Sequence, residues 1–208
     1  MIKKHIYILA TGGTIAGRAA SEEATTGYEA GAIGVADLLA AVPEIRRYAE
    51  VEGEQIAAID SKDMREVIWL RLAARCNALL SREDVDGIVI THGTDTMEET
   101  AYFLHLTVHS EKPIVLTGAM RPATAMSADG PMNLLQAVRV AADDEAAGKG
   151  VLIVLNGTIE SARDAVKTHT TSLDTFRSPE MGALGSVQDG EPVFYRSPLR
   201  RTVPHSAP

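Results

Sequence analysis

The sequence predicts an α/β fold: a doubly wound, mostly parallel sheet flanked by helices, with a C-terminal hairpin and linker region. Three observations predict it. Short runs of apolar, β-branched residues recur along the 208-residue chain, and most of them stop at a glycine. Segments in which apolar residues have helical spacing lie between these runs. Strands that alternate with helices pair in parallel, because each helix crosses the sheet before the next strand begins.

The expected elements follow in order along the chain. Strands are expected at residues 5–10, 51–59, 86–91, 113–117 and 150–155. Helices are expected at residues 34–42, 64–80, 97–109 and 130–147, the first stopped by Pro43 and the last by Gly148. In the second helix one face is expected to point to the core, formed by Met64, Val67, Ile68, Leu72, Cys76, Leu79 and Leu80.

The character of the chain changes after residue 161, where polar and glycine-rich stretches replace the α/β rhythm. The segment Gln188-Asp189-Gly190-Glu191 lies before an apolar run and predicts a hairpin. From residue 197 the chain has little apolar content and several prolines. We therefore expect one α/β domain at residues 1–196, followed by a tail or linker at residues 197–208.

Composition excludes several classes of function. The formal net charge is −8 and no cluster of Lys and Arg stands among aromatics, so we expect no nucleic-acid partner. No apolar run is long enough to span a membrane or to form a signal-peptide core, so we expect a cytoplasmic location unless a leader has been removed. The lone Cys76 fits core packing, and the six histidines have no zinc-binding spacing, so no metal is expected.

Four residues lie just past the ends of expected strands: Thr14, Thr94, Ala119 and Asn156. In a parallel sheet these ends meet at one rim, where ligands bind. The loop at residues 10–17, A-T-G-G-T-I-A-G, invites a nucleotide interpretation, but its glycines fit neither a dinucleotide fingerprint nor a phosphate loop. What remains is the Thr14 hydroxyl on a tight turn among small residues. Taken alone, a threonine in such a place more often has only a structural role in the turn.

A second loop, T-H-G-T-D-T-M-E-E-T at residues 91–100, places a hydroxyl and a carboxylate before a helix. Asp95 or Thr96 could simply cap that helix, and Ser61 could cap the helix expected near Met64. The two loops together resemble the signature pair of the bacterial L-asparaginase family. Further matching segments lie in the same order at residues 61–64, 117–122, 127–131, 157–158, 163–164 and 167–168, so that the resemblance covers nearly the whole chain.

The resemblance implies an amidohydrolase that converts L-asparagine to L-aspartate and ammonia through a threonine ester, with no cofactor. Thr14 matches the family's nucleophile, and Tyr28 matches the tyrosine that hydrogen-bonds it. A second triad is matched by Thr94, Asp95 and Lys167. Apart from the resemblance, Tyr28 reads as a loop residue and Lys167 as a surface lysine. Either could relay the proton from the nucleophile, and a lysine can do so only when it is neutral.

The substrate is expected to contact Ser61, Lys62, Thr94, Asp95 and Ala119. In the family Ser61 matches a hydroxyl that holds the substrate's α-carboxylate, and Asp95 matches the carboxylate that pairs with its α-ammonium group. Lys62 departs from the family, which commonly has glutamine there. A lysine would repel the ammonium group, so it either reaches the α-carboxylate or turns into solvent. The preference between asparagine and glutamine is therefore open.

The sequence also departs from the family at its end. It stops where the typical member enters a linker to a smaller C-terminal domain, which fits both a naturally short member and a piece of a longer chain. That domain supplies a glutamate from a neighbouring subunit in the typical member. The resemblance implies a homo-oligomer, either a dimer or a tetramer. The alternative to an enzyme is a non-catalytic amino-acid-binding or regulatory fragment of an asparaginase.

Overall fold

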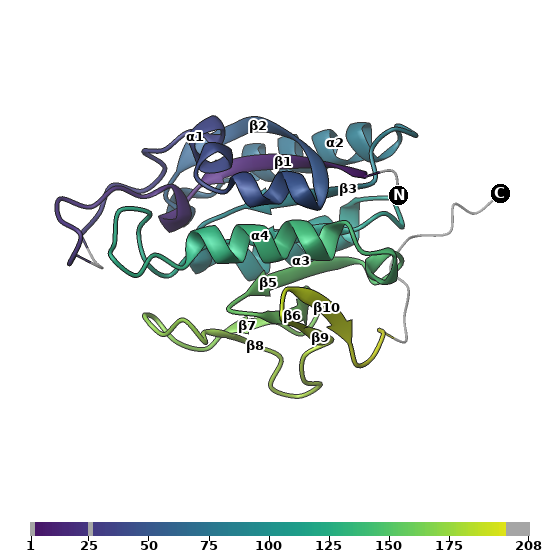
Figure 1. Ribbon diagram of the computed structural model, residues 1–208. Helices are drawn as coiled ribbons and strands as arrows, with labels where there is room; N and C mark the ends of the chain where they lie inside the picture. Colours follow the sequence, from purple (N-terminus) through teal and green to yellow (C-terminus); the bar gives the residue numbers. More distant parts are fainter. Residues whose placement is uncertain (1–2, 25–26, 199–208) are drawn as a thin grey trace.

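The computed structural model describes residues 3–24 and 27–198. Its central feature is an eight-stranded sheet in the order β10-β9-β6-β5-β4-β3-β1-β2 (Figure 1). Five of these strands are parallel to one another: β1 (Lys4–Gly12), β2 (Ala49–Ile59), β3 (Gly87–Thr91), β4 (Ile114–Thr117) and β5 (Val151–Leu155). The mostly parallel α/β sheet predicted from the sequence is confirmed.

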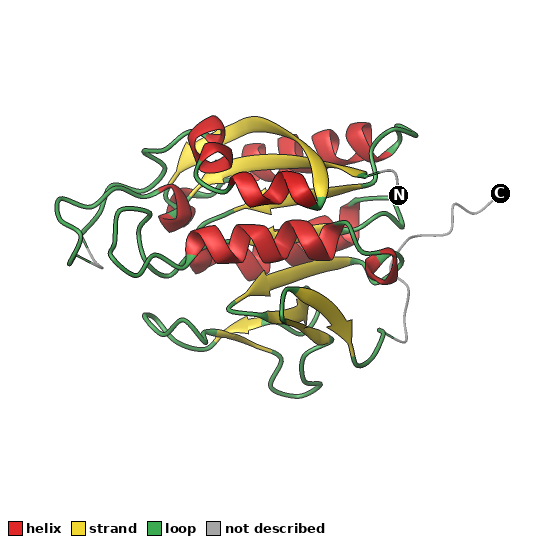
Figure 2. Ribbon diagram, in the orientation of Figure 1, coloured by secondary structure: helices red, strands yellow, loops and turns green. Residues whose placement is uncertain are grey.

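Helices cover both faces of the sheet, as Figure 2 shows. The helices α1 (Val35–Ala40) and α4 (Gly130–Ala141) pack on one face, around Leu38 and Leu134. The helices α2 (Glu66–Leu80) and α3 (Met97–Thr107) pack on the other, around Leu72 and Leu104. The strands between them are buried on both faces, which explains why they read as continuous apolar runs rather than alternating ones.

The antiparallel part of the sheet was only partly predicted. The expected hairpin is confirmed as β9 (Gly185–Gln188) and β10 (Glu191–Phe194), joined by Asp189-Gly190 at positive φ. The strand β6 (Thr158–Ser161) was missed, and it pairs antiparallel with β5 through a two-residue turn at Asn156-Gly157. Both turn residues have positive φ, which is the backbone that an Asn-Gly hairpin turn requires. A short ribbon of β7 (Val166–Lys167) and β8 (Phe176–Arg177) was also missed.

Two helix predictions need correction. The last helix ends at Ala141 rather than at residue 147, because Asp143 accepts a hydrogen bond from the Glu145 amide and starts a separate 3-10 turn, η5 (Asp144–Ala146). Val67 does not face the core, since 69% of it is exposed. The core face of α2 is formed by Leu72, Cys76 and Leu79 with their neighbours. The expected tail falls largely on residues 199–208, which lie outside the described residues.

The strand order positions the site. Strand β1 lies between β2 and β3. The chain therefore runs from β1 to β2 on one side, and then returns to β3 on the other side of β1. The loops that follow β1 and β3 therefore diverge at their carboxyl ends, where open α/β sheets bind ligands. The turn η1 (Thr14–Ala16) follows β1, and the turn η4 (Thr94–Thr96) follows β3. The two threonines thus lie on opposite sides of one crevice.

Candidate active site

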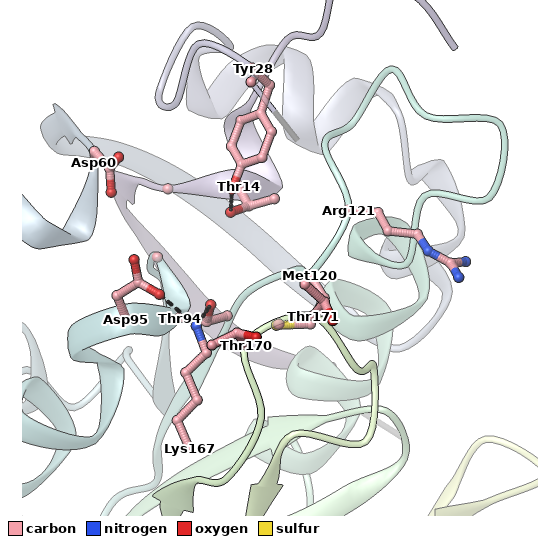
Figure 3. Close-up of a pocket in the computed structure, with 13 residues that line it drawn as sticks. Thr14, Tyr28, Asp60, Thr94, Asp95, Met120, Arg121, Lys167, Thr170 and Thr171 are labelled. Atoms are coloured by element: carbon pink, nitrogen blue, oxygen red, sulfur yellow. Dashed lines mark hydrogen bonds and ion pairs between the residues drawn. The ribbon is translucent and has the colours of Figure 1, made fainter. Parts of the chain in front are cut away.

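A cavity of about 450 Å³ opens at this crevice, within the size range of small-molecule sites. It is lined by residues from both loops and from three further segments: Gly13, Thr14, Gly27, Tyr28, Asp60, Gly93, Thr94, Asp95, Met120, Arg121, Lys167, Thr170 and Thr171. Figure 3 shows Thr14 and Tyr28 on one side of it, Thr94 and Lys167 on the other, and the Arg121 side chain pointing away. All five residues predicted to be catalytic therefore line one cavity.

Thr14 belongs to a turn that only glycine could precede. Gly13 has φ of 78°, and a Cβ atom on it would lie 2.4 Å from the Cα atom of Gly93, at the end of β3. This contact joins the two loops and leaves Thr14 largely buried. The Thr14 hydroxyl lies 2.5 Å from the Tyr28 hydroxyl, and either oxygen can be the donor (Figure 3). A proton can pass along this contact.

Tyr28 is supported by the loop that carries it. Arg18 and Glu29 exchange two backbone hydrogen bonds of 2.9 Å, which close the segment between them into a small antiparallel bridge. The ring of Tyr28 packs against Gly17, where a Cβ atom would lie 2.8 Å from ring carbon Cδ2. The hydroxyl is therefore held toward Thr14 by local packing as well as by its hydrogen bond.

Thr94 is paired with a lysine that is distant in sequence. The Lys167 amine on β7 donates to the Thr94 hydroxyl at 2.9 Å and forms an ion pair with Asp95 at 2.5 Å. The main-chain amide of Lys167 donates to the Glu98 carboxylate on α3, which ties β7 to that helix. Because the lysine is the donor, the Thr94 oxygen accepts, and its own hydrogen is free to point elsewhere.

A buried network holds the end of β3 that carries Thr94. The His92 ring nitrogen Nδ1 lies 2.7 Å from the Gly93 carbonyl, which can only accept, so Nδ1 carries the hydrogen. Nitrogen Nε2 then accepts from the Thr100 hydroxyl at 2.9 Å, and that hydroxyl accepts from Trp69 Nε1 at 2.7 Å. Burial lowers the pKa of His92 to about 4, so the neutral ring is the stable form.

The predicted substrate-binding residues are only partly brought to the cavity. Ser61 is buried, and its hydroxyl accepts a hydrogen bond from the Asp95 amide at 3.2 Å, which joins the two turns. It does not cap α2, whose N-cap is Arg65. Thr96 is the N-cap of α3 but makes no side-chain cap bond, since its hydroxyl donates to the Ser61 carbonyl. The capping alternative for Ser61 is therefore wrong, whereas the one for Thr96 is right in position but not in its side-chain bond.

Lys62 and Ala119 lie outside the cavity lining. The Lys62 side chain is 68% exposed, so it turns into solvent as one of the two alternatives allowed, while its amine pairs at 3.0 Å with Asp60, which lines the cavity. Ala119 is fully buried in the core against α4. Sequence reasoning missed the lining residues Asp60, Thr170 and Thr171. For Asp60 a signal was present, because it directly follows β2 at the same rim of the sheet.

Residues 3–24 and 27–198 contain no group of three or more His, Cys, Asp or Glu side chains placed to hold a metal ion. No helix within the same residues has the length and apolar character to cross a membrane. Cys76 is buried, as its predicted place in the core requires.

Comparisons with known proteins identify the family of this chain. Residues 5–200 match the profile of the family described as asparaginase, N-terminal. This chain belongs to that family. It is 55% identical over 197 residues to L-asparaginase 2 of Bacillus subtilis, a match that covers 95% of this chain and 52% of the relative. It is 53% identical over 194 residues to a probable periplasmic L-asparaginase of Haemophilus influenzae, covering 93% of this chain and 55% of the relative.

A solved structure has the same fold as this chain. The crystal structure of a probable cytoplasmic L-asparaginase from Campylobacter jejuni superposes with a TM-score of 0.95 and 55% identity, covering 97% of this chain and 62% of that one. The chain spans about half the length of the curated relatives it matches. What those longer proteins do is therefore a starting point for a proposal about this chain.

Proposed function

We propose that this chain is an amidohydrolase that converts L-asparagine to L-aspartate and ammonia, with the Thr14 hydroxyl as nucleophile. One observation carries the proposal: the hydroxyls of Thr14 and Thr94 line one cavity, and each is hydrogen-bonded to a separate side chain able to handle a proton. Two hydroxyls so equipped suit a reaction with two attacks, one by the enzyme and one by water. Membership of the asparaginase family supports the same reaction.

In the first step the Thr14 oxygen attacks the carbon of the side-chain amide and its proton leaves toward Tyr28. The proton is returned to the amide nitrogen, and ammonia leaves as the carbon–nitrogen bond breaks, so that an aspartyl ester of Thr14 remains. In the second step a water molecule attacks the ester, one of its protons passes to the Thr14 oxygen as the carbon–oxygen bond to Thr14 breaks, and aspartate leaves with the Thr14 hydroxyl restored. Thr94 is positioned to hold that water, and Lys167 stabilises negative charge on the transition state.

Asp95 is the proposed partner of the substrate's α-ammonium group, because its carboxylate lines the cavity. Ser61 is the proposed donor to the α-carboxylate, because its oxygen accepts from the Asp95 amide and its own hydrogen is left to donate. Some hydrolysis of L-glutamine stays a prediction. Self-association into a dimer or tetramer also stays a prediction. A cytoplasmic location stays one too, since the relatives' names include both a periplasmic and a cytoplasmic protein.

An ammonia-release assay beside a thermal-shift titration tests the proposed function. We expect ammonia to be released from L-asparagine at a rate proportional to enzyme, and L-aspartate to raise the melting temperature. Saturable stabilisation by aspartate or asparagine without release of ammonia would contradict the proposal. That result would favour a non-catalytic amino-acid-binding or regulatory fragment instead.

A further inference from the structure

Two carboxylates from neighbouring turns line the same side of the cavity. Asp60 precedes the turn η3 (Ser61–Asp63), and Asp95 belongs to η4. The turns are joined where the Asp95 amide donates to the Ser61 hydroxyl at 3.2 Å. Figure 3 shows both aspartates on one wall of the cavity, away from Met120 and Arg121. An ammonium group has three hydrogens to donate, so one carboxylate does not exhaust it.

The two carboxylates have counterions of different kinds. The partner of Asp95 is Lys167, which is only 14% exposed and is also bound to the Thr94 hydroxyl. The partner of Asp60 is Lys62, whose side chain is 68% exposed and reaches in from solvent. Exposed ion pairs are weak, because water screens the charges and ordering a long side chain costs entropy. The Asp60 carboxylate can therefore exchange its partner, whereas that of Asp95 is held.

Lys62 keeps its charge near the mouth of the cavity. Its hydrogen bond with Asp60 raises the pKa of Lys62, and the charges of Asp60, Asp63 and Asp95 act in the same direction. A positive charge at this place competes with any cation that approaches Asp60 and repels it. A neutral side chain at position 62 would remove both effects.

We propose that Asp60 is a second recognition residue for the α-ammonium group of the substrate, and that this group displaces Lys62 when it binds. The inference rests on the proposed function, since it concerns the same cavity and an amino-acid substrate. Lys62 then competes with the substrate's ammonium group for the Asp60 carboxylate and so weakens the binding of amino acids. The exchange also makes the pair formed by Asp60 and Lys62 a determinant of specificity, because an amide without an α-amino group gains nothing from it.

Steady-state kinetics on two amides test the proposal. L-Asparagine carries the α-ammonium group, and succinamic acid is the same amide without it. For asparagine we expect Asp60→Asn to raise KM about tenfold, the value of one hydrogen bond to a charged group, with kcat within about threefold. For succinamic acid we expect KM to stay unchanged. Lys62→Gln should lower KM for asparagine, and this gain should vanish in the double variant with Asp60→Asn.

A matched control is Lys4→Gln, since Lys4 forms a comparable exposed ion pair with Asp144 at 2.9 Å, at the opposite end of β1. It should leave KM unchanged for both amides. A change in folding alone would affect the two amides equally. Equal rises in KM for both, or no rise for asparagine in a folded Asp60→Asn variant, would overturn the proposal.

Calorimetry separates this inference from the proposed function. If the chain hydrolyses neither amide, binding of L-aspartate and of succinate is measured on the same variants. Weaker binding of aspartate but not of succinate by Asp60→Asn would support the role of Asp60 even though the enzyme proposal had failed. If Asp60→Asn weakens both ligands alike, or aspartate does not bind the unmodified chain, the role of Asp60 is overturned.

Discussion

Among single residues, His92 is a buried group beside the site with a hydrogen-bond partner on each ring nitrogen. Its ring is fully buried, its Nδ1 hydrogen goes to the Gly93 carbonyl, and its Nε2 accepts from Thr100. A second proton on Nε2 would meet a hydroxyl whose hydrogen already points at it. Protonation therefore requires the Thr100 hydroxyl to turn away and puts a charge in the core beside the strand end that carries Thr94.

This arrangement predicts a stability loss in mild acid. The folded chain holds the pKa of His92 at about 4, against roughly 6.5 in an unfolded chain, so between these values only the unfolded chain takes the proton. Stability is therefore full above pH 6.5 and falls as pH drops toward 4. From pH 7 to pH 5 His92 should remove about 2 kcal/mol from the free energy of unfolding.

Urea unfolding at the two pH values measures the loss, and NMR titration of the His92 ring gives its pKa directly. A His92→Gln variant should lack this part of the pH dependence. If the ring titrates near pH 6.5 in the folded protein, the network drawn around it is wrong.

At the scale of elements, the β7–β8 ribbon carries Lys167 to the cavity. Its turn is held by Thr175, which is fully buried. The Thr175 hydroxyl accepts from the His169 amide at 3.2 Å and donates to the His169 carbonyl, while the Thr168 amide donates to the Thr175 carbonyl at 2.7 Å. The cavity residues Thr170 and Thr171 lie in the same turn. One hydroxyl thus supports both the lysine and a wall of the cavity.

Replacing Thr175 by valine keeps the shape of the side chain and removes its hydrogen bonds. We expect about 1–3 kcal/mol of destabilisation, and loss of hydrogen-exchange protection confined to residues near 167–177. Ammonia release should fall, because Lys167 is no longer held against Thr94. The control is Thr107→Val at the end of α3, where the hydroxyl bonds to the Phe103 carbonyl far from the cavity. If both variants have the same activity, the ribbon does not position Lys167.

At the scale of the whole molecule, the site depends on close contact between the loops that follow β1 and β3. Gly13→Ala tests this contact, because the new Cβ atom would lie 2.4 Å from Gly93 at a φ of 78°. The matched control is Gly148→Ala, which has a φ of 72° but no atom within 4 Å of the new Cβ. Positive φ should cost each variant about 1–3 kcal/mol, and Gly13, with ψ of −172°, lies in a region that essentially only glycine adopts. The clash should add roughly 1–3 kcal/mol at Gly13 alone.

Chemical unfolding of both variants measures the difference, and the ammonia assay shows its effect on the site. Gly13→Ala should lose activity as well as stability, whereas Gly148→Ala should lose stability alone. Equal stability and equal activity in the two variants would mean that the loops do not need to meet.

Much of this architecture could be predicted from the sequence, because buried parallel strands leave a plain apolar signal. The end of α4 could not, since the local bonds of Asp143 outweighed the helical pattern that continues beyond it. The turn at Asn156-Gly157 carried a hairpin signal, but the strand after it, β6, has only four residues and no run of apolar side chains. At the site, the place of Thr14 and Thr94 just after strands was visible in the sequence, and the resemblance to the family then gave them their roles.

The partners of these threonines needed more than local pattern. Lys167 reaches Thr94 across 73 positions of sequence, and only the resemblance to the family singled it out. The outward turn of Lys62 depends on Asp60, whose role as a counterion is visible only once the side chains are placed.

The attack of the Thr14 hydroxyl on the amide is the central claim, and replacing Thr14 by alanine and by serine tests it most directly. Steady-state ammonia release from L-asparagine is measured for both variants, with melting temperatures to show that they fold. Thr14→Ala should lower kcat by on the order of 10⁴-fold or more, as loss of a nucleophile does, while Thr14→Ser should keep a measurable part of the activity because its hydroxyl remains. A folded Thr14→Ala variant that keeps kcat within about tenfold of the original chain would contradict the account.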